Sequence, residues 1–425
     1  MTFVLVAGFS LLLCLIALRV PALGLGLAAG ADLVLMEGVS LGGTTIALES
    51  FFFLYLLCVP VIGQLVVGGR ARLQLSAALP FALFGLAFLG VCAVSGVLGG
   101  MQGNSQTVLT RLPLWILFGV VPVWLCRSAR DVQRVAVCVI GACLLLLLLG
   151  LATGLPAPDE QGGLMRHRYL NPLGHAMSLG CVLSFGLFAT RSVRGVWRSA
   201  PAVLAVAFGL AVLWTGSRGS LISCVVGLAA IAWVVSPGRA KSAGKLAALA
   251  GSALLLFALF SGQVSAAWQG FLANDASSNL YRYQIAVLAT RLFLENPLVG
   301  VGLGGMEQAG LFMASDLRSL AATIIVSDND YARVLAELGL LGAGLIAWFA
   351  WRLRGALAAR IRATRALGER QGLAVALGAG IGVNLMLLGL FESVFFSPTG
   401  WFYLGLVWAC TRVREHGPMR QEVAV

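Results

Sequence analysis

The fold class is decided by a stretch in the first half of the chain, where residues 135–153 read VAVCVIGACLLLLLLGLAT. The stretch holds no charged residue, and its length is in the range of about 17–25 residues that crosses a bilayer core as a helix. Arg127, Arg130 and Arg134 stand just before it. Because basic residues collect on the cytoplasmic side of a membrane, the two features together predict an oriented transmembrane helix.

Apolar stretches of similar length recur along the whole chain. They lie near residues 2–18, 20–36, 50–69, 75–98, 112–126, 135–153, 170–190, 200–215, 219–236, 246–263, 328–351, 371–391 and 399–411. Arg19, Val20 and Pro21 interrupt the first two, which leaves open whether these form two helices, one broken helix or a re-entrant pair. A backbone in lipid satisfies its own hydrogen bonds as a helix, so the sequence predicts an all-α polytopic membrane protein with about 12–13 transmembrane helices.

The composition excludes an ordinary soluble protein. Hydrophobic residues make up 59% of the 425 residues and charged residues only 11%, too few to cover a soluble surface. The net charge of +12 is concentrated in every second gap between apolar stretches, and the longest cluster runs from Arg352 to Arg370. This spacing predicts a cytoplasmic C-terminus and argues against nucleic acid as a partner. The nine cysteines and three histidines lack metal-ligand spacing, so we expect no metal and no cofactor.

One long loop divides the chain into three parts. Residues 1–263 hold the first ten predicted helices, residues 264–327 form the loop, and residues 328–425 hold the last three helices and a tail. By alternation the loop faces outward. Apolar residues recur at helical spacing over 278–294, which predicts an amphipathic helix at the membrane surface. The loop is too apolar for disorder, and we expect it to cap a site.

Some arginines lie on the predicted outer side, where topology gives no reason for them. They are Arg111, Arg166, Arg168, Arg218, Arg282, Arg291, Arg318 and Arg333. Arg218 is the sharpest case, because it lies between two apolar stretches in the turn Thr215-Gly216-Ser217-Arg218-Gly219-Ser220. The planar guanidinium suits phosphate oxygens, whereas the alternative is an arginine that reaches from a helix end to lipid headgroups.

A second polar cluster opens the stretch that follows the long loop. Residues 327–333 read SDNDYAR, and Glu337 follows one turn later. Ser327 or Asp328 would cap the helix. Capping does not account for Asp330 and Arg333 as well, and a carboxylate there could act as general base for a sugar hydroxyl. Whether Asp328 is a base or a cap stays open.

A glycine-rich segment, residues 300–305, follows Glu295-Asn296-Pro297 and superficially suggests a nucleotide-binding loop. No predicted β-strand precedes it and no βαβ unit surrounds it, so we expect a turn within the outer loop.

Three segments together resemble the O-antigen ligase and polymerase superfamily of bacterial membrane glycosyltransferases. The turn around Arg218 is similar to the Ser-Arg-Gly motif of the family. Tyr281-Arg282-Tyr283 with residues 295–302 resembles its outer-loop arginine and N-P-x-x-G-x-G motif. Residues 328–342, which read DNDYARVLAELGLLG, resemble the motif that opens the next span. The segments occur in the family's order and cover roughly residues 210–345.

The resemblance implies a GT-C-like fold and a donor glycan on undecaprenyl pyrophosphate, used without a metal at the outer face of the inner membrane. Arg218 and Arg282 match positions that bind the pyrophosphate. Arg166 and Arg168 either add a phosphate contact or stabilise their loop, and Arg333 is a further candidate. The ligase branch has a histidine where this chain has Asp328, which favours the polymerase branch.

The predicted function is therefore a repeat-unit polymerase for O-antigen or exopolysaccharide, located in the bacterial inner membrane with its site facing the periplasm. It would transfer glycan from undecaprenyl pyrophosphate to the non-reducing end of another lipid-linked unit, with Asp328 or Asp330 as base. The expected partners are the lipid-linked donor and acceptor, membrane lipids and a chain-length regulator. The alternatives are a ligase that uses a lipid or protein acceptor and, from another class, a flippase of lipid-linked oligosaccharides.

Overall fold

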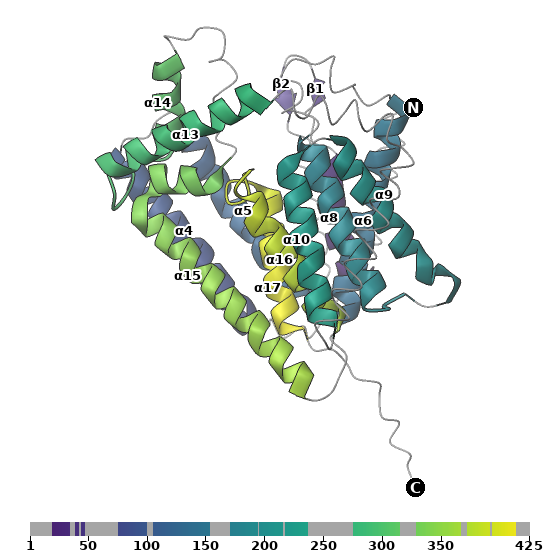
Figure 1. Ribbon diagram of the computed structural model, residues 1–425. Helices are drawn as coiled ribbons and strands as arrows, with labels where there is room; N and C mark the ends of the chain where they lie inside the picture. The colour runs from purple at the N-terminus through teal and green to yellow at the C-terminus, as the bar shows by residue number, and fades with distance from the viewer. Residues whose placement is uncertain are drawn as a thin grey trace.

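The computed structural model is a helical bundle with a smaller helical layer at one end (Figure 1). It describes residues 19–34, 39–41, 44–46, 75–99, 105–153, 171–193, 195–215, 217–236, 275–314, 329–366, 372–391 and 393–413.

The described elements are almost all helices. They are α2 (Pro21–Val34), α4 (Leu75–Gly99), α5 (Ser105–Leu125), α6 (Ala129–Thr153), α8 (Asn171–Ala189), the 3-10 helix η2 (Gly195–Ser199), α9 (Ala200–Thr215), α10 (Arg218–Val235), α13 (Asp275–Glu295), α14 (Gly305–Ala314), α15 (Asp330–Ala366), α16 (Leu373–Leu388) and α17 (Pro398–Arg412). A short antiparallel hairpin, β1 (Val39–Leu41) with β2 (Thr44–Ile46), is the exception within the described ranges, and it pairs Val39 with Ile46.

The all-α polytopic class predicted from the sequence is confirmed. Within the described residues, seven helices are long and apolar enough to cross a membrane, and Pro21–Gly30 and Leu373–Leu388 are shorter apolar helices. α2 begins at Pro21, where the sequence predicted an interruption. The predicted spans 2–18, 50–69 and 246–263 lie outside the described residues, so the total of 12–13 stays a prediction.

Two predicted helix starts were wrong because a polar first turn escapes a search for apolar residues. α5 begins at Ser105 instead of residue 112, and α6 begins at Ala129 instead of residue 135. At α6 the Ser128 N–H donates to Asp131 Oδ2 at 3.0 Å, and the Asp131 N–H donates to Ser128 Oγ at 3.3 Å. This reciprocal cap stabilises the first turn of α6, which carries Arg130.

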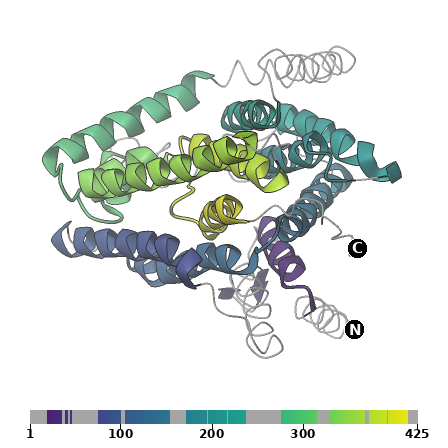
Figure 2. The same ribbon diagram turned by 90° about the horizontal axis from the view of Figure 1, so that it is seen from below.

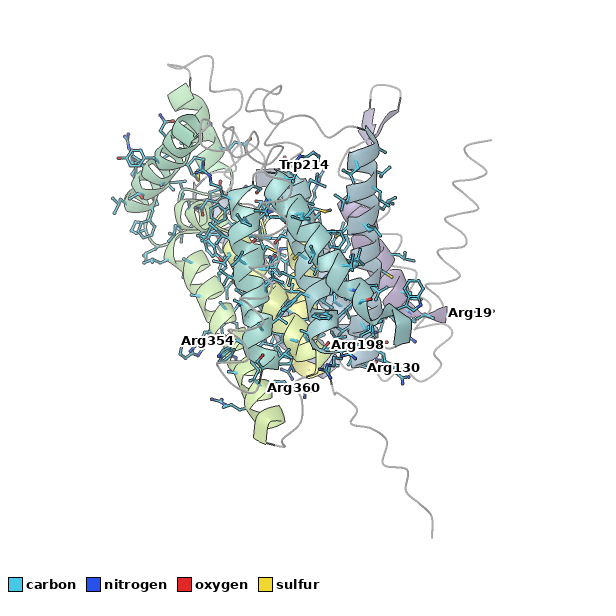
Figure 3. The ribbon with its side chains drawn as sticks, turned by 45° about the vertical axis from the view of Figure 1, so that its right-hand side comes forward. Arg19, Arg130, Arg198, Trp214, Arg354 and Arg360 are labelled. Atoms are coloured by element: carbon cyan, nitrogen blue, oxygen red, sulfur yellow. The ribbon has the colours of Figure 1, made fainter. Side chains whose placement is uncertain are left out.

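The bundle has two chemically different ends. Arg130, Arg198, Arg354 and Arg360 lie at one end, which we call the basic end, and Trp214 lies at the other (Figure 3). The opposite end also carries α13, α14 and the start of α10 (Figure 1), and we call it the motif end. A band of arginines at one end is what the positive-inside rule predicts for the cytoplasmic boundary of a membrane protein.

The core of the bundle is built around α17. Seen from below (Figure 2), α17 lies between the α4–α5 side and the α8–α10 side, and α16 packs on α10. Trp401 of α17 is fully buried among Phe81, Phe84 and Phe88 of α4. Its indole N–H donates to the carbonyl of Phe395 at 2.9 Å, so the one polar atom of this ring is satisfied.

Helix α15 is interrupted at Gly339, where φ is 61° and ψ is −156°. The turn formed by residues 296–302 fills the interruption. Backbone hydrogen bonds run from Val301 N–H to Ala336 O (2.9 Å), Gly302 N–H to Glu337 O (3.2 Å), Leu340 N–H to Pro297 O (2.8 Å) and Leu341 N–H to Leu298 O (3.1 Å). The turn therefore satisfies backbone groups on both sides of the break, as a broken helix at membrane depth requires.

Glycines make this docking possible. Gly300, Gly302 and Gly304 have φ of 72°, 96° and 76°, in the left-handed region that favours glycine. A Cβ on Gly300 would lie 2.3 Å from the Glu337 carbonyl carbon, and one on Gly339 would lie 2.6 Å from Leu298. The glycine-rich segment is a turn that follows helix α13, as the sequence predicted.

Two glycine-to-alanine substitutions in α15 test whether the break at Gly339 requires glycine. We expect Gly339→Ala to destabilise the protein by about 2 kcal/mol or more, because alanine is strained at positive φ and its methyl group would meet Leu298. Gly344→Ala, where a Cβ would meet nothing within 4 Å, should be neutral or stabilising by up to about 1 kcal/mol. The thermal midpoints of the two purified variants in detergent provide the measurement. Equal shifts for Gly339→Ala and Gly344→Ala would show that the backbone break at Gly339 does not require glycine.

Candidate functional site

The Ser-Arg-Gly turn sits at the motif end, where α10 begins. Ser217 is the N-cap, and its Oγ accepts a long hydrogen bond of 3.5 Å from the Ser220 N–H. Arg218 is the first residue of the helix and is partly exposed, whereas Ser217 and Ser220 are buried. The free N–H groups in the first turn of a helix attract anions. The positive charge of Arg218 in this turn adds to that attraction.

A buried polar chain fixes this turn to α8. Ser220 Oγ donates to Ser217 Oγ at 2.8 Å and lies 3.0 Å from His175 Nδ1. Because the hydroxyl hydrogen of Ser220 goes to Ser217, the consistent tautomer has His175 Nδ1–H donating to Ser220. These hydrogen bonds connect the turn of Arg218 to α8. Nothing in the sequence placed His175 in the site, because its spacing was informative only about metal binding.

The start of α15 has a different cap from the one predicted. Asn329 Oδ1 accepts the Ala332 N–H at 3.0 Å, so Asn329 caps the helix instead of Ser327 or Asp328. The reason is geometric: the helix begins at Asp330, which makes the residue before it the N-cap. Asp328 lies outside the described residues, one position before the cap.

Asp330 is fully buried and binds the connection between α16 and α17. Its Oδ1 accepts the hydroxyl of Ser393 at 3.0 Å, and its Oδ2 accepts the backbone N–H of Phe395 at 2.5 Å and that of Val394. The backbone N–H of Asp330 donates to Gly389 O at 2.9 Å. Both carboxylate oxygens are thus engaged, and Asp330 holds the connection against the start of α15.

Arg333 and Glu337 form an ion pair one turn further along α15. Arg333 Nε donates to Glu337 Oε2 at 3.0 Å, and the two side chains are 13% and 1% exposed. The guanidinium also lies over the ring of Phe396, 4.2 Å from its centroid. Asp330 and Glu307 add negative charge near Arg333.

The α16–α17 connection, residues 389–397, joins the two motif segments. Its Phe391 packs on Gly219 so closely that a Cβ there would lie 2.5 Å from the ring. Its next residues bind Asp330, and its Phe396 lies beneath Arg333. Sequence analysis did not identify this connection as part of the site. The available signal was the aromatic and serine residues in a short loop between two apolar helices.

The structure gives less information on the three other arginines that the sequence predicted as site residues. Arg282 belongs to α13, and Arg166 and Arg168 lie outside the described residues. α13 packs on the first half of α15, where Leu288 and Leu292 meet Ala336. The helix that carries Arg282 therefore touches the half-helix that carries Asp330 and Arg333. Within the described part of the chain, no group of three or more His, Cys, Asp or Glu side chains could hold a metal.

The buried ion pair yields a double-mutant prediction. Glu337→Leu should destabilise the protein by about 3–5 kcal/mol, because it leaves the charge of Arg333 largely buried without its partner. Adding Arg333→Met should recover most of that loss, since an apolar pair replaces the ion pair. Thermal midpoints of both single variants and the double variant provide the measurement. A double variant as unstable as Glu337→Leu alone would show that the unpaired charge of Arg333 does not cause the loss of stability.

The comparison with known families agrees with the position of these motifs. No curated protein matches the chain. Residues 201–347 match the sequence model of the family described as O-antigen ligase, and this range runs from α9 to beyond the break in α15. It contains Arg218, Arg282, Asp330 and Arg333. The chain is a polytopic membrane protein that carries an O-antigen ligase family domain, consistent with the O-antigen ligase and polymerase superfamily.

Proposed function

We propose that this protein is a repeat-unit polymerase of O-antigen or exopolysaccharide. The observation that carries the proposal is the α16–α17 connection, which packs on the Ser-Arg-Gly turn and binds the acid at the start of α15. Two segments more than a hundred residues apart in sequence are held at one end of the bundle by a third. A glycosyl transfer from a pyrophosphate needs a cation for the leaving group and a carboxylate for the acceptor, and this connection contacts the turn of Arg218 and binds Asp330.

In the proposed reaction the donor is a glycan on undecaprenyl pyrophosphate. Arg218 binds the pyrophosphate, aided by the helix start on which it stands, and Arg282 binds it from α13. Arg166 and Arg168 are proposed as further contacts. As the anomeric C–O bond breaks, the leaving pyrophosphate takes the electron pair, and the arginines stabilise the charge that develops.

The acceptor is the non-reducing end of another lipid-linked unit. Its hydroxyl oxygen forms the new bond to the anomeric carbon, and its proton passes to a carboxylate. We assign this base to Asp328, because Asn329 supplies the helix cap and Asp330 has both oxygens engaged. Asp330 remains the alternative base. Arg333, whose charge Glu337 balances, is proposed as a secondary phosphate contact that also orders the start of α15.

We further propose that the motif end faces the periplasm of a bacterial inner membrane. The basic end then faces the cytoplasm, which agrees with the positive-inside rule. Undecaprenyl-pyrophosphate-linked oligosaccharides are the proposed donor and acceptor, and a chain-length regulator is a proposed partner.

A ligase is the second candidate, because the family that matches residues 201–347 is described by that activity. The choice of polymerase rests on Asp328, which stands where the ligase branch has a histidine. A flippase is the third candidate. It is supported less well, because the buried or largely buried ionisable side chains described above, Asp330, Arg333 and Glu337, all lie on the first two turns of α15.

The proposal is tested by incubating the purified protein in liposomes with lipid-linked repeat units and sizing the products. A ladder of lengthened lipid-linked glycans is the expected result. Transfer only when a different acceptor is added would replace the polymerase with a ligase. Absence of transfer to any acceptor, combined with movement of the substrate across the bilayer, would replace it with a flippase.

A further inference from the structure

We propose that a pocket beside the helix break, separate from the arginines, binds a neutral sugar residue of the lipid-linked glycan. The inference rests on the proposed function and adds a saccharide subsite to it. The pocket has a volume of about 450 Å³, in the range of about 300–1,000 Å³ that is typical of small-molecule sites. It lies between the end of α4, the end of α13, the 296–302 turn and α14.

The lining of the pocket selects against a charged ligand. Among the described residues that line it, the polar side chains are the amides of Asn296 and Gln308, and none is charged. Its apolar wall is formed by Leu98, Leu292 and Ala309. Amide and backbone groups beside an apolar wall suit a sugar, which presents hydroxyl groups at its edge and C–H groups on its face. A pyrophosphate would meet no cation among the described residues that line this pocket.

One atom points to a hydroxyl donor. Gln308 lines the pocket, and its side-chain oxygen is buried without a hydrogen-bond partner among the residues that the structure describes. A buried acceptor without a donor is destabilising, and a sugar hydroxyl would supply the missing hydrogen bond. A hydrocarbon chain could not do so, although Val97 and Leu98 are 73% and 66% exposed beside the pocket. The same atom therefore disfavours the polyprenyl chain as the occupant.

The pocket is connected to the proposed transfer site by the turn of residues 296–302. Gly300 and Val301 line the pocket, and the Val301 N–H donates across the helix break to Ala336 O at 2.9 Å. Arg333 and Glu337 stand on the half-helix that ends at that break. A sugar in the pocket would thus be held by the same turn that orders the half-helix carrying these charges.

Two substitutions test the pocket. Gln308→Leu removes the unpaired oxygen, and Ala309→Leu fills the space. The matched control is Ala286→Leu, the same change on an exposed position of α13 that does not line the pocket. The full-length protein is studied in nanodiscs. The probes are the repeat-unit oligosaccharide, released from its carrier by mild acid, and sugar-free undecaprenyl pyrophosphate.

We expect the wild-type protein and Ala286→Leu to bind the oligosaccharide in saturation-transfer NMR. Both pocket variants should bind it about ten-fold more weakly or worse, and their affinity for undecaprenyl pyrophosphate should not change. Gln308→Leu should keep or raise the thermal midpoint, because it removes a buried unpaired acceptor. That combination of weaker binding and undiminished stability is not expected of a purely structural residue.

Three results would overturn the subsite: no oligosaccharide binding by the wild-type protein, unchanged binding by both pocket variants, or weakened binding of the sugar-free carrier. The polymerase proposal fails separately. If the oligosaccharide binds as expected but no glycosidic bond forms in the transfer assay, the subsite stands and the polymerase assignment does not.

Discussion

Arg218→Ala should abolish polymer formation while the protein still inserts and folds. Arg218 is partly exposed at the first position of α10, and the cap and polar chain that order the turn belong to Ser217, Ser220 and His175. Removing the guanidinium should leave that framework in place. Loss of one group that stabilises a developing charge typically lowers the rate by about 10²–10³-fold. The rate of lengthening of lipid-linked units by the purified variant is the measurement.

Two further variants sharpen this result. Arg218→Lys keeps the charge but loses the planar fork, so we expect a rate between those of the wild type and Arg218→Ala. Arg291→Ala makes the same change at an exposed arginine of α13, whose partner is Glu295 at 3.2 Å, and should leave the rate unchanged. Lengthening at the wild-type rate by Arg218→Ala would remove this residue from the site.

Asp330→Ala should have the largest effect on stability. The substitution leaves the backbone N–H groups of Val394 and Phe395 without their acceptor in a buried place. Each such group costs about 1–3 kcal/mol, so the total should be several kcal/mol. Ser393→Ala removes only a hydroxyl from the same cluster and should cost about 1 kcal/mol. The thermal midpoints in detergent should follow that order.

Asp330→Asn distinguishes a positioning role from catalysis. The amide keeps one acceptor oxygen, so part of the protein should still fold, and its rate per folded molecule should stay within a few-fold of the wild type. Asp328→Asn, measured in parallel, should be stable and inactive if Asp328 is the base. A folded but inactive Asp330→Asn protein together with an active Asp328→Asn protein would reverse the two assignments.

The features that could be predicted from the sequence are those encoded locally. An apolar stretch that crosses a membrane is visible in the residues themselves, and the helices from α8 to α10 begin and end within two residues of the predicted spans. The arginine bands are equally local, and they gather at one end of the bundle (Figure 3). The motifs around Arg218 and Asp330 were found because residue type and order identify them.

The features that could not be predicted depend on contacts between distant residues. α15 reads as one continuous span, because Gly339 within an apolar stretch is tolerated in a membrane helix. The backbone hydrogen bonds that stabilise the break come from residues 297–302, which lie far from Gly339 in the sequence. Likewise, nothing near Asp330 in sequence shows that its partners are Val394 and Phe395, more than sixty residues away. The role of the α16–α17 connection appears only when the chain is folded.

If the protein is a polymerase that uses lipid-linked repeat units, each new glycosidic bond releases one undecaprenyl pyrophosphate. The most direct measurement counts sugar-free undecaprenyl pyrophosphate by mass spectrometry while the purified protein lengthens lipid-linked repeat units. We expect release and bond formation to match one for one, and Arg218→Ala to suppress both together. Lengthening without release, or release by simple hydrolysis without lengthening, would rule out this transfer reaction.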